Sequence, residues 1–300
     1  MAEKPELKEK KTIWDKLQDL PVSSLFILVI LSMSIIYVYP IGLPVPITQM
    51  AKDTFNALNT LPSGSYIWIY NAYATGSIAV HEPGLIAILR HSIAKHFKII
   101  LWSADTPIML FPRVLEKIKP DLDRANYVYG KDWAYLYIPG GEPIWANILQ
   151  DVWSVVTVDK DGKPFTQMPL MVDIKNRGPT YNSVNIVFFQ TTGGETVDGM
   201  VRQVNVRYHQ MTGVRLIGQI LEIMVPAARP YYNAGNMDGI MNGGVGAAEY
   251  ELLLGRPGAA LKVTDMLSLA QLIVLAYWAV GNVGFFMKRY SRASVPKGGG

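Results

Sequence analysis

Two long stretches without a charged side chain constrain this chain more than any other feature of its sequence. Residues 22–39 read VSSLFILVILSMSIIYVY, and residues 266–287 read MLSLAQLIVLAYWAVGNVGFFM. A helix rises about 1.5 Å per residue, so roughly 20 apolar residues cross the hydrocarbon core of a bilayer. The second stretch meets this length, and the first only just does. The sequence therefore predicts two transmembrane helices, with the lipid bilayer as a partner.

The first stretch does not read as a cleaved signal peptide. The 21 residues before it mix acidic side chains with the lysines, and PIGLP at 40–44 follows it instead of a small-residue cleavage site. A cleaved signal has a short, positively charged beginning and a small-x-small site at its end. We therefore expect an uncleaved signal anchor.

The distribution of lysine and arginine predicts the orientation, because these residues resist translocation. Five lysines precede the first stretch and four basic residues follow the second, whereas only Lys52, Arg256 and Lys262 border the stretches on the other side. The balance of nine to three predicts that residues 1–21 and 288–300 are cytoplasmic tails and that residues 45–262 form an extracytoplasmic domain.

The absence of cysteine bears on both chemistry and location. The chain has no cysteine, which excludes disulfides, thiolate catalysis and zinc–thiolate sites. A large translocated domain without cysteine favours the plasma membrane of a bacterium or archaeon over a eukaryotic secretory pathway.

The region between the two stretches alternates short apolar runs with helical periods. The runs expected to be strands are residues 66–70, 98–102, 134–138, 185–189 and 214–223. Short, continuously apolar strands separated by helices are typical of a parallel sheet covered on both faces. The sequence thus predicts an α/β fold, a Rossmann-like three-layer sandwich with a mostly parallel sheet. We expect a helix opening near Pro83, a surface loop or hairpin at 162–178, and short helices at 229–258.

The loops after the strands hold the candidate site, because ligands of an open parallel sheet bind beyond the carboxyl ends of its strands. These loops combine hydroxyls, carboxylates and glycines. The candidate ligand-binding residues are Asp105, Thr106, Gly140, Gly141, Glu142, Thr191, Thr192, Gly193, Gly194 and Glu195. A carboxylate there could serve as acid or base, but in a first helical turn it is also an ordinary cap. The sequence assigns no catalytic residue.

One segment resembles a known family. Residues 187–200, VFFQTTGGETVDGM, resemble the strand, glycine pair and helix of Clp-type and signal-peptide-peptidase-type serine proteases, and Gly218-Gln219 is similar to the stretch before their nucleophile. Residues 220–223, ILEI, stand where that family has its serine. The resemblance therefore implies a likeness of fold or an inactive relative, since acyl transfer has no starting atom without the nucleophile.

Cofactor, metal and nucleic-acid binding are not expected. Neither the P-loop nor the dinucleotide-binding glycine pattern occurs at a strand–helix turn. The four histidines, His81, His91, His96 and His209, lack the spacing of a metal site. A net charge of +4 without a basic run gives no footprint for nucleic acid.

These observations predict a membrane-anchored extracytoplasmic α/β domain that is a scaffold or accessory subunit of a cell-envelope complex. The expected partners are other membrane or envelope proteins. The second stretch contains Gln271, Asn282 and several small residues, which suit close helix packing. This packing is either between the two spans of one chain or with another subunit, and a homo-oligomer is one possibility. Two alternatives remain: an extracytoplasmic, hydrolase-like enzyme that uses the carboxylates beyond the strands, and a ligand-binding sensor.

Overall fold

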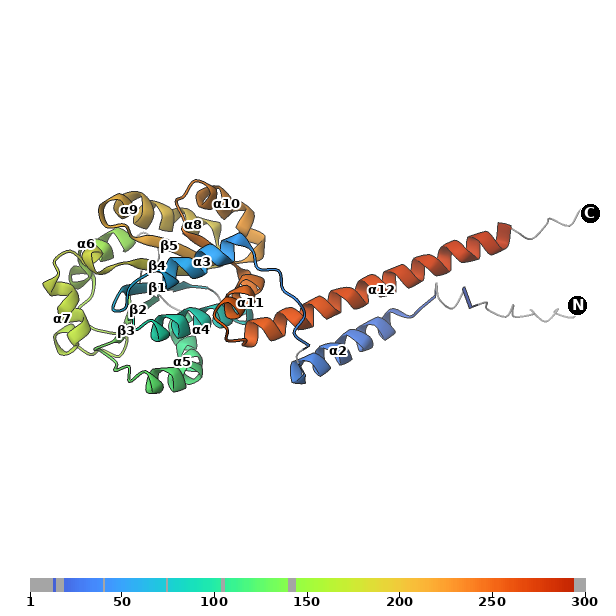
Figure 1. Cartoon of the computed structure of the whole chain (residues 1–300), viewed down its shortest axis with the longest axis horizontal. Coiled ribbons are helices and arrows are strands. Elements are labelled where there is room, and N and C mark those ends of the chain that lie inside the picture. The colour runs from blue at the N-terminus through green and yellow to red at the C-terminus, as the bar shows by residue number, and fades with distance from the viewer. Residues whose placement is uncertain are drawn as a thin grey trace, which may run out of the picture. The chain divides into compact units, whose positions relative to one another are not determined.

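The computed structural model describes residues 13–14, 19–39, 41–73, 75–103, 106–139 and 144–293. The chain divides into two compact units (Figure 1). One comprises residues 44–261, and the other comprises residues 1–43 and 262–300.

A six-stranded parallel sheet forms the centre of residues 44–261, counted over the described chain (Figure 1). The strands are β1 (Tyr66–Ala72), β2 (Lys98–Ser103), β3 (Trp133–Tyr137), β4 (Ile186–Thr191), β5 (Arg215–Ile220) and β6 (Gly239–Asn242). Their order is β3-β2-β1-β4-β5-β6, and every neighbouring pair is parallel. This confirms the predicted α/β fold with a parallel sheet, which fits a Rossmann-like sandwich. The order reverses between β1 and β4, so this pair is the topological switch point.

Each strand supplies side chains to two hydrophobic cores, one on each face of the sheet. In β1, Tyr66, Trp68 and Tyr70 belong to one core, and Ile67 and Ile69 belong to the other. Successive side chains of a strand point to opposite faces, so a continuously apolar strand must be covered on both sides.

Helices cover both faces. On the face of Ile67 and Ile69 lie α3 (Gln49–Asn59), α4 (Ile78–Ala94), α5 (Thr106–Arg124) and α11 (Gly243–Leu253). On the opposite face lie α6 (Trp145–Val155), α7 (Pro169–Asn176), α8 (Gly194–Met200), α9 (Val206–Thr212) and α10 (Val225–Asn233).

The structure differs from the sequence prediction in three segments. Residues 229–258, expected to be short helices, contain the strand β6 as well as α10 and α11. Residues 162–178, expected to be a surface excursion, contain α7, whose Leu170, Met171 and Ile174 are buried in the core. Pro83 does not open its helix but lies inside α4, which starts at Ile78.

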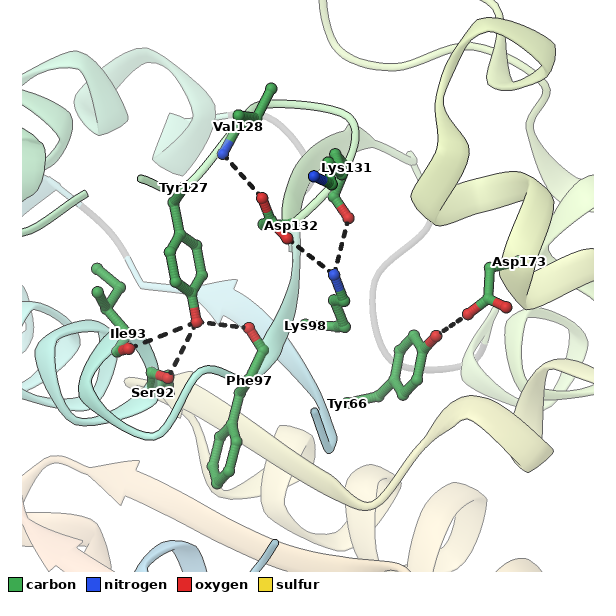
Figure 2. Close-up of polar contacts among 10 residues, drawn as sticks. All are labelled: Tyr66, Ser92, Ile93, Phe97, Lys98, Tyr127, Val128, Lys131, Asp132 and Asp173. Carbon is green, nitrogen blue, oxygen red and sulfur yellow. Dashed lines mark hydrogen bonds and ion pairs between the residues drawn. The ribbon is translucent and has the colours of Figure 1, made fainter. Parts of the chain in front are cut away.

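At the amino-terminal ends of the strands, polar contacts join the sheet to a neighbouring loop and to α7. Lys98, at the start of β2, donates to Asp132 at 2.8 Å, and the Tyr66 hydroxyl of β1 donates to Asp173 of α7 (Figure 2). Burial, and then Asp173, raise the pKa of Tyr66 well above its usual value. The tyrosine therefore stays protonated and keeps donating to the carboxylate.

The second unit contains two apolar helices, α2 (Val22–Val38) and α12 (Ala259–Ala293). The first three residues of α12 belong to the sheet-containing unit. Within α12, Ala259–Tyr290 is long and apolar enough to cross a membrane, by length and composition alone. At 17 residues, α2 is a shorter apolar helix.

Hydrogen bonds link α12 to residues near both ends of α2. The Tyr277 hydroxyl of α12 donates to the Pro21 carbonyl at 2.7 Å, just before α2 begins. Beyond the other end of α2, the N–H groups of Gly42 and Leu43 donate to the Asp265 carboxylate at 2.8 and 3.0 Å. The two helices therefore run in opposite directions.

Candidate functional site at the carboxyl end of the sheet

Half of the residues proposed from the sequence are described only in part or not at all. Asp105, Gly140, Gly141 and Glu142 lie outside the described residues. Thr106 is the first residue of α5, and its side chain also lies outside the description. The structure describes the other five, which form the turn between β4 and α8.

The β4–α8 turn is held by its own residues. The Thr191 hydroxyl accepts from the Gly193 N–H at 3.0 Å, which closes a local turn at the end of the strand. Gly193 has an ordinary extended backbone, and a side chain at this position would meet nothing within 4 Å. Glu195 is exposed in the first turn of α8. This geometry does not require glycine at Gly193, in contrast to a loop that wraps closely around a phosphate.

A row of four polar side chains crosses the end of the sheet beside this turn. Ser103, Asn71, Gln190 and Gln219 are register partners at the ends of β2, β1, β4 and β5, so all four lie on the same face. Each of the four residues is buried. We call these four residues the polar row. It spans the switch point, where an α/β protein of this order usually binds its ligand.

Gln190 and Gln219 join the polar row to two helices. The Gln190 amide donates to the His81 carbonyl in α4 at 2.7 Å and to the Gln219 side chain at 2.5 Å. The Gln219 amide donates to the Val80 carbonyl at 2.8 Å and to the Gly243 carbonyl at 3.1 Å. The row thus holds the first turns of α4 and α11 against the sheet.

Close packing accompanies these bonds at Gly84 of α4. A β-carbon there would lie 2.3 Å from the Gln219 side-chain oxygen. Any other residue there would have to displace the Gln219 side chain, so glycine lets α4 approach the end of β5 with that side chain in place.

His81 lies between two carbonyl groups. Its Nδ1 is 3.2 Å from the Ser77 carbonyl and its Nε2 is 3.2 Å from the Thr191 carbonyl, and Tyr73 stacks on the ring. Burial lowers the pKa of His81, although both carbonyls and Glu222 oppose the shift. A neutral imidazole has one N–H, so it donates to only one of these carbonyls at a time.

A buried carboxylate follows His81 in the chain. Lys117 of α5 donates to Glu82, and the Arg113 guanidinium lies 3.7 Å from its other oxygen. The Glu82 side chain is 5% exposed, so its charge depends on these two partners from α5. The pair connects α4 to α5.

The amino terminus of α11 would suit an anion, but a side chain of this chain takes that place. Gly243 has a φ of +49°, and a β-carbon there would lie 2.1 Å from the Glu222 carboxylate. Glu222 accepts from the Gly244 N–H at 2.7 Å. The carboxylate therefore satisfies a free N–H of the first helical turn, where a bound phosphate would otherwise do so.

Some buried oxygens of the site have no hydrogen-bond partner among the described residues. They are Asn71 Oδ1 and Gln190 Oε1 in the polar row, Asn242 Oδ1 at the end of β6, and the Glu82 Oε2 that lies 3.7 Å from Arg113. Buried polar atoms are usually paired, and an unpaired one costs free energy or marks a place where another molecule binds.

The residues described contain no group of three or more histidine, aspartate or glutamate side chains placed to hold a metal ion. The sequence prediction included the Thr191–Glu195 turn but missed the polar row. The signal of that row is an uncharged polar residue near the end of each of four apolar runs.

No family model matches this chain, and no curated protein matches it either.

Proposed function

We propose that this chain is a membrane-anchored scaffold or accessory subunit of a cell-envelope complex, with its α/β domain outside the cytoplasm. In this proposal α2 and α12 both cross the plasma membrane of a bacterium or archaeon, and both tails are cytoplasmic. Other membrane or envelope proteins are its partners.

The observation that carries the proposal is the closure of the switch point by the chain itself. In the described residues, Gln190 and Gln219 of the polar row bind the backbone of α4 and α11, and Glu222 occupies the amino terminus of α11. An enzyme needs such groups to face its substrate. Groups that hold helices in place instead serve to fix the shape of the domain.

The apolar surface of the two helices supports the membrane anchor. Phe26 and Ile30 of α2 are 62% and 63% exposed, and Trp278 of α12 is 68% exposed. Large apolar side chains in such numbers on an exposed helix need a covering medium, and for these segments lipid is the proposed one.

Cysteine labelling tests the topology, because the natural chain has no cysteine to interfere. Asp161→Cys places a thiol on an exposed side chain of the domain, and Lys297→Cys places one in the carboxyl-terminal tail. A membrane-impermeant maleimide should label the first variant in intact cells and the second only after lysis. Labelling of the tail but not of the domain would reverse the proposed orientation.

The assembly itself is tested by extracting the full chain from its native membrane in mild detergent and measuring the mass of the particle. We expect a defined particle larger than the 33.3 kDa chain with its detergent, containing other envelope proteins in fixed ratio. Glu195→Gln should leave this particle unchanged. A single monodisperse chain would contradict the scaffold role.

The unpaired oxygens favour one second candidate, a ligand-binding sensor. Asn71 Oδ1 and Gln190 Oε1 come from adjacent strands at the switch point, and both are buried. A small molecule with N–H or O–H donors would satisfy them. If the chain is a sensor, a metabolite extract of its own cells should raise the melting temperature of the natural full chain but not that of Asn71→Leu. If it is a scaffold, the extract should raise the melting temperature of neither.

A further inference from the structure

Three arginines converge around a cavity away from the polar row. The cavity has a volume of about 220 Å³, and its lining includes Arg90, Arg124 and Arg256 together with His96 and Asp121. Arg90 comes from α4 and Arg124 from the end of α5, while Arg256 lies in the loop between α11 and α12. Residues far apart in the sequence therefore build one basic pocket.

A single carboxylate in the lining faces all three guanidinium groups. Asp121 lies 3.0 Å from Arg90, 3.0 Å from Arg256 and 3.6 Å from Arg124. One negative charge balances one arginine, so the lining keeps an excess of two positive charges. Glu251 also acts on Arg90, but its carboxylate accepts from the N–H groups of Gly258, Ala260 and Leu261.

At the carboxyl end of α4, near this cavity, the last carbonyls have hydrogen-bond partners. The carbonyls at a helix carboxyl terminus repel anions when they are unsatisfied. Here the Lys95 N–H donates to the His91 carbonyl, and the Phe97 N–H donates to the Ser92 carbonyl. The Tyr127 hydroxyl also contacts the Ser92, Ile93 and Phe97 carbonyls (Figure 2).

We propose that this basic pocket binds a phosphate-class anion. Guanidinium groups recognise phosphate oxygens through paired N–H donors, and three of them around one cavity can share a single phosphoryl group. Arg124 and Arg256 are 73% and 44% exposed, so an anion can reach them from solvent. Asp121 holds the guanidinium groups together when the pocket is empty and competes with the anion for them. This site does not depend on the scaffold role.

Two sources offer this chemistry. Only nine residues separate Arg256 from Met266, where the apolar stretch begins, so the phosphate of an anionic lipid headgroup is one source. A soluble phosphate or phosphate monoester is the other.

The experiment uses the full chain in nanodiscs in phosphate-free buffer of constant ionic strength. One arm titrates inorganic phosphate and glycerol 3-phosphate into phosphatidylcholine nanodiscs and follows the melting temperature and the binding heat. The other arm compares the melting temperature in phosphatidylcholine nanodiscs with that in phosphatidylglycerol nanodiscs. A response in the first arm identifies soluble phosphate compounds as ligands, and a response in the second alone identifies the lipid headgroup.

Variants separate binding from folding. We expect Arg90→Gln and Arg256→Gln each to weaken the responding ligand about tenfold, as for loss of a charge-assisted hydrogen bond. The control is Arg202→Gln, since Arg202 pairs with Asp198 four residues earlier and is not among the residues that line the cavity. Asp121→Asn should lower the melting temperature without ligand yet tighten anion binding, an outcome that a purely structural cluster does not give. No response in either arm, or weaker binding by Asp121→Asn, would overturn the proposal.

Discussion

At the residue scale, His91 makes the stability of the domain depend on pH. It is buried in α4, its Nδ1 lies 2.6 Å from the Tyr250 hydroxyl, and Phe55 stacks on its ring. Burial, and to a lesser degree Lys95, lower its pKa from 6.5 to about 4. The neutral ring is therefore part of the folded core.

The direction of the pH dependence follows from this lowered pKa. Above about pH 6.5 the ring is neutral in both states, and its contribution to stability is fully present. As the pH falls from 6.5 towards 4, the unfolded chain binds a proton that the folded chain does not, and stability falls by on the order of 3 kcal/mol. His81, whose pKa is also lowered, adds a loss of the same sign.

Unfolding of the full chain in detergent at pH 7 and pH 4.5 measures this loss. His91→Gln should make the decrease in the free energy of unfolding smaller, because it removes one of the two groups. His96→Gln, which changes an exposed histidine five residues further on, should leave the decrease in the free energy of unfolding unchanged. An equal decrease in the natural chain and in His91→Gln would show that His91 does not carry the effect.

The unpaired oxygen of Asn71 gives a prediction with the opposite sign to most core substitutions. Asn71 is 2% exposed, and its Oδ1 has no partner among the described residues. Leucine has the same number of side-chain heavy atoms in the same branched arrangement and no polar atom to leave unpaired, so Asn71→Leu should stabilise the chain by about 1 kcal/mol.

Thermal unfolding in detergent followed by near-UV circular dichroism tests this. Asn176→Leu, at an exposed position at the end of α7, serves as the control and should change stability by less than about 0.5 kcal/mol. If Asn71→Leu lowers the melting temperature, the Asn71 side chain makes a contact that holds the fold together.

Part of the candidate site could be predicted from the sequence, but the alignment of residues such as Gln190 on neighbouring strands could not. A carboxylate after a strand suggests chemistry by its type, so Glu195 was proposed, and the structure places it exposed at the start of α8. Gln190 and Gln219 draw attention only once the register aligns them on neighbouring strands. Register is a property of strand pairing, and periodicity within one strand does not contain it.

At the element scale, α11 joins two other helices through its carboxylates. Glu249 accepts from the Thr48 N–H and hydroxyl just before α3, at 3.0 and 2.6 Å. Glu251 accepts from three N–H groups at the start of α12, at 2.9 to 3.2 Å. A helix amino terminus has free N–H donors and a positive end, so each carboxylate fixes where another helix begins.

We therefore expect Glu251→Ala to destabilise the chain by about 1–2 kcal/mol, as for loss of a helix cap, because three N–H groups lose their acceptor. Urea unfolding of the full chain in detergent measures the change. Glu195→Ala is the matched control, since Glu195 is an exposed carboxylate in the first turn of α8, and it should cost only a few tenths of a kcal/mol. Equal costs for the two variants would contradict the capping role of Glu251.

The elements that the sequence missed are short ones. The strand β6 has four residues, GIMN, and it begins with glycine, which weakens strand formation. It pairs with β5, and its Ile240 and Met241 are buried in the hydrophobic cores on the two faces of the sheet. The five strands that were predicted are longer, with five to seven residues each, so each is easier to recognise from its own sequence. Tertiary packing decides β6, and the local pattern does not show it.

At the scale of the whole molecule, the two apolar stretches should differ in what they contribute to anchoring. Among the helices of the described residues, the C-terminal one alone is long and apolar enough to span a bilayer, with 32 residues from Ala259 to Tyr290. The N-terminal helix has 17 residues, which rise about 25 Å against a hydrocarbon core of about 30 Å. A tilt cannot lengthen it, so flanking residues or local thinning of the bilayer must make up the difference.

A chain that ends at Leu261 isolates the role of α2. This truncation keeps the whole of the sheet-containing unit and removes α12 beyond its first three residues. If α2 is an uncleaved signal anchor, the truncated chain should remain in the membrane pellet after carbonate extraction, because the 17 residues of α2 carry no charge and are mostly apolar. Its domain should also remain accessible to an impermeant maleimide at Asp161→Cys in intact cells.

The matched control places charge in the middle of the same helix. In the truncated chain, Leu28→Lys together with Leu31→Lys puts two lysines into α2, at a cost of about 2.5–3.5 kcal/mol each at the bilayer centre. This variant should appear in the carbonate supernatant. If the truncated chain without the lysines also appears in the supernatant, α2 does not cross the membrane. In that case α12 is the sole anchor, and the domain and the amino-terminal tail must lie on the same side of the membrane.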